Sequence, residues 1–167
     1  MPEPSTVVLG LGNPLMGDDG LGLAVLDRLR EEWDLPDTVE LVDGGTWGMT
    51  LLPLIEDADR LILIDAIRTG APAGTVVEVE REHLPRYLSH KLSPHQIDLK
   101  EVLALADLRG TLPEQTVAIG AEPGEVVLST ELTAALEASV ERVSSAVVAR
   151  LARWGHVCRR RRVPIGA

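Results

Sequence analysis

The sequence predicts a single layered α/β domain in which most of the strands are parallel. Short apolar runs alternate along the chain with segments in which apolar residues recur every three or four positions, and this alternation is typical of α/β folds. Several of the runs contain no interspersed polar residues, as expected for strands that are buried on both faces of a sheet. The length of 167 residues and the mass of 18.0 kDa fit one domain.

Five apolar runs are predicted to be strands. The first, at 6–11, is apolar almost throughout and is expected to be buried on both faces. The fourth, at 75–79, follows the third after a turn rich in Gly and Pro at 69–74, so we expect it to be antiparallel and to lie at an edge. The other four can be parallel and joined by helical crossovers. The predicted strands are 6–11, 39–42, 60–66, 75–79 and 115–120.

Four segments have the apolar spacing of helices. In the first, apolar residues recur at every fourth position from Leu21 to Trp33, with charged residues on the opposite side. The last is the longest, and Ser129 or Thr130 is expected to cap its N-terminus because a side-chain oxygen there can accept a free backbone N–H. The predicted helices are 21–33, 49–55, 99–106 and 132–154.

Composition and charge exclude several classes of protein. The net charge of −10 argues against a nucleic-acid binder, which needs clustered Lys and Arg to neutralise phosphates. No apolar run approaches the roughly 20 residues that span a bilayer, and the acidic, Pro-containing N-terminus is unlike a secretion signal. The single cysteine, Cys158, cannot form an internal disulfide. We therefore expect a cytoplasmic protein with no membrane or nucleic-acid partner.

The C-terminal residues differ in charge from the rest of the chain. Residues 153–167 contain five arginines and no acidic residue, whereas residues 1–152 contain 11 basic and 26 acidic side chains. Charge runs at chain ends are commonly solvated and disordered. We therefore expect a single α/β domain at 1–152 and a flexible basic tail at 153–167. The alternative is that the four arginines at 159–162 bind an acidic partner.

Acidic and histidine side chains follow the predicted carboxyl ends of several strands, where open α/β sheets bind ligands. Asp18 and Asp19 follow the first strand. Asp65 ends the third strand, and His90 and His95 follow the fourth. Two carboxylates and one imidazole are oxygen and nitrogen ligands suited to nickel or zinc. Asp19, Asp65 and one of the histidines can therefore form a metal site, although a helix cap, a strand-end acid and a surface histidine would leave the same pattern.

Two other chemistries fit the sequence less well. The loop after the first strand offers Gly10 and Gly12 of a dinucleotide fingerprint, but Leu15 stands at the third glycine position, and the adjacent acids would repel a pyrophosphate. No Gly-Lys-Ser/Thr follows, as a P-loop requires. Cys158 lies in the basic tail with no base near it, and no Gly-x-Ser-x-Gly elbow occurs.

Four segments taken together resemble the [NiFe]-hydrogenase maturation endopeptidases, which remove the C-terminal peptide from the hydrogenase large-subunit precursor after nickel insertion. The segments occur in the family's order, and the resemblance covers about residues 5–152. It implies a three-layer sandwich, with a five-stranded, mostly parallel, twisted sheet and helices on both faces. The matching segments are GLGNPLMGDDGLG at 10–22, DGGTWG at 43–48, LIDA at 63–66 and SPHQIDL at 93–99.

The resemblance also implies functional residues. The family's metal ligands, which are also the expected catalytic residues, fall on Asp19, Asp65 and His95. The family often has Glu at the position of Asp19, so the oxygen chemistry is kept with a shorter reach. His95 is preferred to His90 because it stands in the family's Ser-x-His-Gln pattern. The possible supporting residues are Asn13, Asp18, Gly44, Gly45, Thr46 and His90.

The resemblance further implies that nickel is supplied by the substrate, with zinc or cadmium able to substitute in vitro, and that the metal serves either recognition or metal-assisted hydrolysis. The expected partner is the large-subunit precursor, and the expected oligomeric state is a monomer. Two alternatives stay open: a non-catalytic chaperone of the immature large subunit, and a related peptidase that acts on another precursor. Peptidyl-tRNA hydrolases share a similar opening at 10–14, but the Tyr and the Arg-His-Asn signature expected next are absent.

Overall fold

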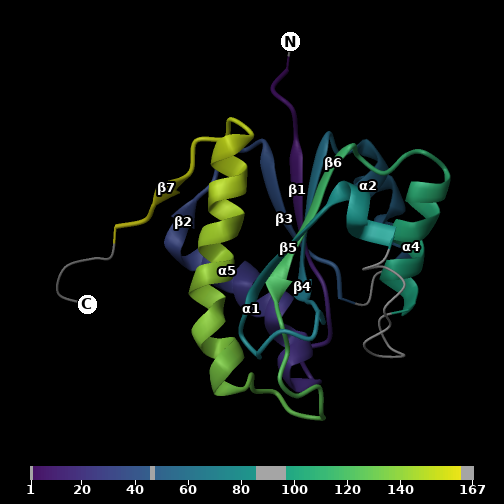
Figure 1. Cartoon of the computed structure of the whole chain (residues 1–167). Coiled ribbons are helices and arrows are strands. Elements are labelled where there is room, and N and C mark those ends of the chain that lie inside the picture. The colour runs from purple at the N-terminus through teal and green to yellow at the C-terminus, as the bar shows by residue number, and fades with distance from the viewer. Residues whose placement is uncertain (1, 46–47, 86–96, 163–167) are drawn as a thin grey trace.

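The computed structural model describes residues 2–45, 48–85 and 97–162 and has a five-stranded sheet at its centre (Figure 1). The strands are β1 (Thr6–Gly10), β3 (Val39–Asp43), β4 (Arg60–Ala66), β5 (Val76–Glu80) and β6 (Gln115–Ala121). They lie side by side in the order β3-β1-β4-β6-β5. All pairs are parallel except β5 with β6, so the predicted antiparallel edge strand is confirmed.

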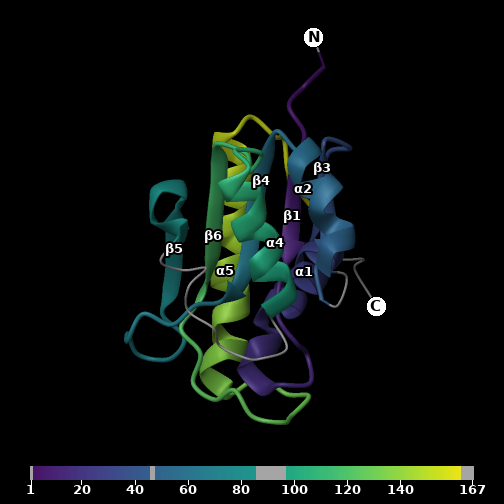
Figure 2. The same ribbon diagram turned by 90° about the vertical axis from the view of Figure 1, so that its right-hand side faces the viewer.

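Helices cover both faces of the sheet, which confirms the three-layer architecture (Figure 2). On one face lie α1 (Leu21–Glu32) and α5 (Ala134–Arg153), and on the other lie α2 (Leu52–Asp57) and α4 (Ile97–Leu108). Three short 3-10 helices join them: η1 (Gly17–Gly20), η2 (Gly48–Leu51) and η3 (Arg81–His83). The first helix ends one residue earlier than predicted because Trp33 begins a short strand, β2 (Trp33–Asp34).

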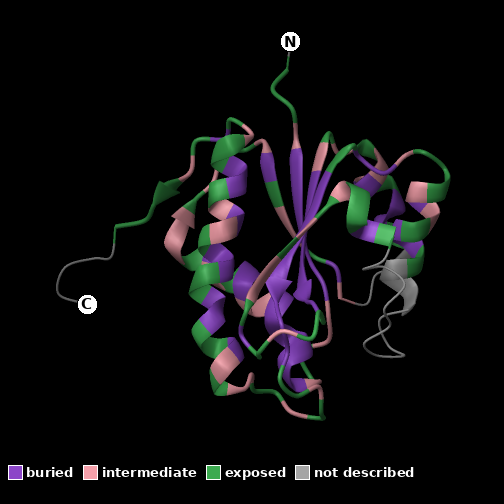
Figure 3. Cartoon of the chain, viewed as in Figure 1, coloured by how far each residue is buried: buried purple, intermediate pink, exposed green. Residues whose placement is uncertain are grey.

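Two apolar cores lie on the two faces of the sheet, and the three central strands between them, β1, β4 and β6, are almost entirely buried (Figure 3). Neighbouring residues of β4 belong to different cores: Leu63 belongs to the core that includes Leu103 of α4, whereas Ile64 belongs to the core that includes Val143 of α5. This follows from the strand geometry, in which successive side chains point to opposite faces. None of the helices in the described ranges is long and apolar enough to cross a bilayer.

The C-terminal residues lie against the domain as far as residue 162. The strand β7 (Arg159–Arg160) pairs antiparallel with β2. Arg160 lies 5.5 Å from the ring centre of Trp33 and 3.3 Å from a carboxylate oxygen of Glu32. The sequence predicts a flexible tail from residue 153, but its arginines contact carboxylates and an indole that are more than 120 positions away in the chain. The domain boundary at residue 152 stays a prediction.

His156 fixes the start of this C-terminal segment. It is buried, with Nε2 2.7 Å from the hydroxyl of Thr6 and Nδ1 3.1 Å from the hydroxyl of Thr38. Burial, assisted by the positive charge of Arg60, lowers the pKa of His156 below its ordinary value of 6.5. The imidazole is therefore neutral at neutral pH, with one ring nitrogen donating and the other accepting. It ties the segment to the amino ends of β1 and β3.

Candidate functional site

The carboxyl ends of the parallel strands form the end of the sheet at which Asp18, Asp19 and Asp65 lie. From the N-terminus, β1 runs downward in Figure 1, and the chain then turns through residues 11–16 into η1. The turn is attached to the neighbouring strand, because the backbone N–H of Leu11 donates to the carbonyl of Ile64 at 2.8 Å. Within the turn, the side-chain oxygen of Asn13 accepts the N–H of Leu15 at 2.9 Å. Asn13 therefore holds the loop in shape.

Asp19 and Asp65, two of the three predicted metal ligands, are both fully buried at this end of the sheet. Asp19 lies in η1, and its Oδ2 accepts the backbone N–H of Asn13 at 2.9 Å. Asp65 is the penultimate residue of β4, and its Oδ1 accepts the backbone N–H of Ala66 at 2.9 Å. Because η1 packs against β4, the structure brings the two carboxylates to the same end of the fold.

Two glycines permit this close packing. A Cβ on Gly22 would lie 2.3 Å from the carbonyl oxygen of Leu11 and 2.6 Å from that of Ile64, so only glycine lets α1 begin so near β1 and β4. A Cβ on Gly120 would lie 1.7 Å from the carbonyl oxygen of Asp65. Glycine in β6 therefore allows the backbone that carries Asp65 to sit where it does.

Asp18 joins the loop of Asp19 to a distant part of the chain. It is fully buried, and its carboxylate accepts hydrogen bonds from the backbone N–H groups of Gly124 (2.7 Å), Glu125 (3.0 Å) and Thr133 (2.7 Å). The hydroxyl of Thr133 donates a fourth, at 2.9 Å. These four donors replace the hydrogen bonds with water that the carboxylate loses when it is buried. Asp18 is therefore a structural anchor for η1.

The last helix begins later than its predicted caps. Its N-cap residue is Thr133, not Ser129 or Thr130, and the Thr133 side chain makes no capping hydrogen bond. Thr133 instead donates its hydroxyl to Asp18. Ser129 is engaged elsewhere, since its backbone groups pair with residues 15 and 17 of the loop before α1. The prediction of Ser129 or Thr130 as the cap used only neighbouring residues in the sequence. The start of the helix is set instead by contacts with residues 15–18, more than 100 positions away in the chain.

Three of the predicted site residues, Thr46, His90 and His95, lie outside the described residues. The third metal ligand therefore stays a prediction. Within residues 2–45, 48–85 and 97–162, no group of three His, Cys, Asp or Glu side chains is placed to hold a metal ion. A three-ligand site that includes Asp19 and Asp65 accordingly needs a side chain from outside those ranges.

Gly44 and Gly45 continue the chain beyond the carboxyl end of β3. The backbone N–H of Gly44 donates to the carbonyl of Gly10 at 2.8 Å, which extends the pairing of β3 with β1 by one step. The N–H of Gly45 donates to the side chain of Asp43 at 2.8 Å. This end of β3 therefore borders the same loop as Asp19, and the supporting role of the two glycines stays a prediction.

Glu122 is a buried carboxylate at this end of the sheet that the sequence pattern did not single out. It follows β6 and accepts hydrogen bonds from the backbone N–H (2.6 Å) and hydroxyl (2.9 Å) of Thr69. It also accepts the N–H of Gly70 at 3.3 Å. Glu122 thus holds the loop between β4 and β5. The signal that could have found it is an acid directly after an apolar strand, the same signal that identified Asp65.

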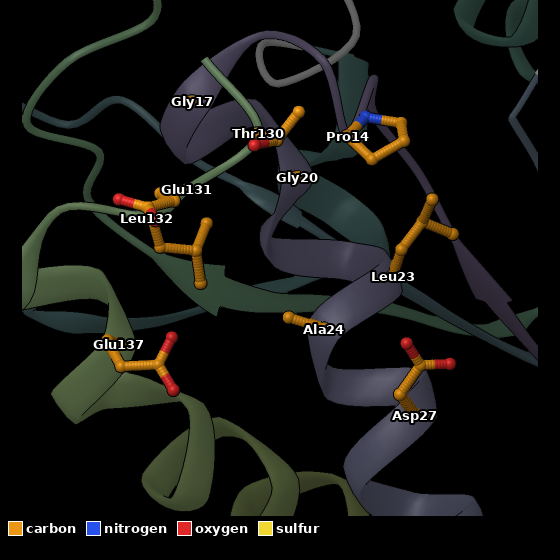
Figure 4. Close-up of a pocket in the computed structure, with 10 residues that line it drawn as sticks. All are labelled: Pro14, Gly17, Gly20, Leu23, Ala24, Asp27, Thr130, Glu131, Leu132 and Glu137. Carbon is orange, nitrogen blue, oxygen red and sulfur yellow. The ribbon is translucent and has the colours of Figure 1, made fainter.

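A pocket of about 480 Å³ lies on the outer side of η1, between α1 and the start of α5 (Figure 4). Leu23 and Leu132 line it with apolar surface, and Asp27 and Glu137 face it from the two helices. The pocket is thus an external feature of the loop whose inner side carries Asp18 and Asp19.

Comparison with known proteins identifies relatives across nearly the whole chain. The model of the HycI hydrogenase maturation protease family matches residues 23–150. The Hydrogenase 2 maturation protease of Escherichia coli (strain K12) is 36% identical over 151 residues, which cover 89% of this chain and 92% of that protein. The hydrogenase expression/formation protein HupD of Thiocapsa roseopersicina is 37% identical over 169 residues, which cover 95% of this chain and 73% of that protein.

Solved structures match in fold as well as in sequence. The hydrogenase maturating endopeptidase HybD from E. coli matches with a TM-score of 0.87 and 34% sequence identity, covering 94% of this chain and 98% of that chain. The [NiFe] hydrogenase maturation protease HybD from Thermococcus kodakarensis matches with a TM-score of 0.70 and 27% identity, covering 87% and 98%. Fold, sequence and the matched family model agree: the chain belongs to the hydrogenase maturation protease family and is an endopeptidase, a hydrolase.

Proposed function

We propose that the protein removes the C-terminal peptide from the large-subunit precursor of a [NiFe]-hydrogenase after nickel has been inserted, and that it recognises the nickel carried by that precursor. The observation that carries the proposal is the burial of two carboxylates, Asp19 and Asp65, at the same end of the sheet. The two carboxylates come from different elements, η1 and the end of β4, which pack against each other, and two oxygen ligands from separate elements at one end of a sheet are a donor set that suits a metal.

The donor set fits a metal presented by a substrate. Asp19 and Asp65 would supply oxygen ligands and His95 a nitrogen ligand, which suits nickel and also zinc or cadmium as in vitro substitutes. Three protein ligands leave room for groups that belong to the precursor. A metal held there can polarise a scissile carbonyl or activate a water molecule. In this proposal, the protein's own contribution is to place two carboxylates rigidly, through η1 and through the end of β4.

The experiment uses purified protein with nickel-loaded and nickel-free large-subunit precursor from the same organism. Intact mass measurement reports the loss of a C-terminal peptide. Cleavage of the loaded form alone supports both the reaction and its dependence on nickel. Cleavage of both forms would retain the peptidase and reject nickel as the signal.

Cleavage of neither form would reject the proposed reaction, and stable capture of the uncut precursor would then indicate a chaperone. Cleavage of a different precursor protein would instead indicate a related peptidase. We also propose a cytoplasmic location, because the one cysteine, Cys158, is a free thiol, as is usual in a reducing compartment. Action as a monomer stays a prediction.

A further inference from the structure

Exposed apolar side chains are concentrated at one place on the described part of the molecule. The described residues include five large apolar side chains that are exposed, and three of the five lie on two neighbouring loops: Leu15 (55% exposed), Val127 (51%) and Leu128 (85%). Leu15 belongs to the loop between β1 and η1, and the other two to the loop between β6 and α5. Exposed apolar residues that occur singly are normal, whereas a contiguous group marks an interaction surface.

The two loops are fixed to one another, so this exposure does not come from a frayed segment. The backbone N–H of Ser129 donates to the carbonyl of Leu15 at 2.9 Å, and the N–H of Gly17 donates to the carbonyl of Ser129 at 2.8 Å. The carboxylate of Asp18 adds bonds to Gly124, Glu125 and Thr133. A surface that is already rigid loses little conformational entropy when a partner binds to it.

The pocket beside these loops adds negative charge to the apolar surface. Three carboxylates line it, from Asp27, Glu131 and Glu137, and no Lys, Arg or His lines it. Asp27 also pairs with Arg30 at 3.3 Å. Among the described residues, no side chain donates a hydrogen bond or forms an ion pair with the carboxylates of Glu131 and Glu137. In Figure 4, Glu137 and Asp27 face each other from α5 and α1 across the apolar side chains between them.

The pocket adjoins the loop that carries two residues of the candidate site. Its lining includes Gly17 and Gly20, the two ends of η1, which bracket Asp18 and Asp19. A partner seated in the pocket would therefore rest on the outer side of the loop whose inner side carries a predicted metal ligand. Such a position suits a surface that holds one part of a substrate protein while another part of the same substrate reaches the site.

We propose that Leu15, Val127, Leu128 and the pocket form a docking face for the folded body of the large-subunit precursor, which presents an Arg or Lys side chain to the pocket and apolar side chains to the three exposed residues. The inference rests on the proposed function and adds to it the chemistry by which the protease selects its substrate. In this proposal, apolar contact supplies affinity. The ion pair between the pocket carboxylates and the basic side chain of the precursor steers association and selects the partner.

The test compares two substitutions on the docking face with two matched controls. Leu128→Ser removes an exposed apolar side chain from the face, and Leu108→Ser removes one of equal exposure, 85%, at the far end of α4. Glu137→Lys reverses a charge in the pocket, and Glu114→Lys makes the same reversal just before the amino end of β6, at the opposite end of the sheet. Thermal melting of each variant confirms that it is folded.

Steady-state cleavage of nickel-loaded precursor then separates docking from chemistry. We expect Leu128→Ser with Glu137→Lys to raise KM about tenfold with little change in kcat, and the two controls together to change KM by less than about twofold. Added salt should raise KM for the wild type more than for Glu137→Lys, because salt screens the charge pair. An equal KM in docking and control variants would overturn the docking face while cleavage by the wild type stands. If the wild type cleaves nothing, the proposed function itself fails.

Discussion

Asp18 and Thr133 lie 115 positions apart in the chain, yet Thr133 donates both its backbone N–H and its hydroxyl to the carboxylate of Asp18, at 2.7 and 2.9 Å. This contact connects the 3-10 helix that carries Asp19 to the residue that begins the last helix. Asp18, the neighbour of the predicted metal ligand Asp19, is therefore a structural residue. The position of Asp19 depends on the segment around Thr133, more than 100 residues further along the chain.

Replacing Asp18 by Asn should weaken both the fold and the cleavage reaction. An amide has one acceptor oxygen, so its NH₂ group must face at least one of the backbone N–H groups that now donate to the carboxylate. We expect a loss of about 3 kcal/mol in the free energy of unfolding, measured in urea. Release of η1 should also lower kcat for precursor cleavage.

Glu122→Gln is the matched control for this variant, because Glu122 is also a buried carboxylate that accepts backbone N–H groups, but it holds the loop between β4 and β5. The backbone N–H of Asn13, which donates to Asp19, reports on the site directly by hydrogen exchange. Its protection should fall in Asp18→Asn and persist in Glu122→Gln. Equal protection of Asn13 in both variants would show that Asp18 does not position Asp19.

Gly120→Ala should be strongly destabilising, because the new Cβ would lie 1.7 Å from the carbonyl oxygen of Asp65, which is a backbone atom and cannot turn away. We expect a loss of about 3 kcal/mol or more in the free energy of unfolding. Gly45→Ala is the comparison, since its Cβ would lie 2.9 Å from the side-chain oxygen of Asp43, which can rotate. Urea denaturation that ranks the two variants equally would contradict the close packing of β6 on β4.

The buried His156 should make stability depend on pH. Its pKa is lowered in the folded protein, so below the unfolded value of 6.5 the unfolded chain binds a proton that the folded chain does not. The stabilising effect of the neutral, buried imidazole is therefore fully present above pH 6.5 and is lost as the pH falls through the lowered pKa. We expect the free energy of unfolding to fall between pH 7.5 and pH 5.5.

Two substitutions assign this dependence to one residue. His156→Gln should flatten the change between the two pH values, whereas His83→Gln, at a side chain that is 74% exposed, should leave it as in the wild type. The measurement is urea denaturation at both pH values. A slope that is unchanged in His156→Gln would place the titrating group elsewhere.

Asp65→Asn should leave the fold largely intact and impair cleavage, because the side chain keeps its shape and loses the charge that a metal ligand needs. Changes around metal ligands commonly cost ten- to a hundredfold, so loss of a ligand should lower the rate of precursor cleavage by at least about a hundredfold. Intact mass follows the cleavage, and circular dichroism checks the fold. Cleavage at the wild-type rate would show that Asp65 is not a ligand.

The two histidines of the segment outside the described residues can be ranked by the same assay. The sequence predicts His95 as the ligand, so His95→Ala should reduce cleavage of nickel-loaded precursor much more than His90→Ala. Both substitutions remove an imidazole of the same size, and each is the control for the other. The opposite ranking would assign the ligand to His90.

The sequence by itself determined the elements and most of their arrangement. β4 has the bounds that were predicted, 60–66, because it is buried on both faces and its centre, residues 61–64, is an uninterrupted apolar run that is visible without knowledge of its neighbours. The antiparallel edge strand was predictable for a similar reason, since a short turn after β4 leaves no room for a crossover helix. The common location of Asp19 and Asp65 was predictable because the carboxyl ends of parallel strands meet at one end of the sheet, while their role as metal ligands stays a prediction.

Only the tertiary structure decided which residues serve the scaffold. Asp18 and Asp19 are adjacent and chemically identical in the sequence, but the fold gives Asp18 the distant donors Gly124, Glu125 and Thr133, whereas Asp19 accepts the N–H of Asn13 within its own loop. The run of arginines at 159–162 carries no local sign that two of them form β7 and pair with β2. Hydrogen bonds and ion pairs between residues more than 100 positions apart leave no periodicity and no local motif, because they depend on how the sheet and its helices are packed. Propensity and pattern act within a few residues, and these contacts exist only once the whole fold has formed.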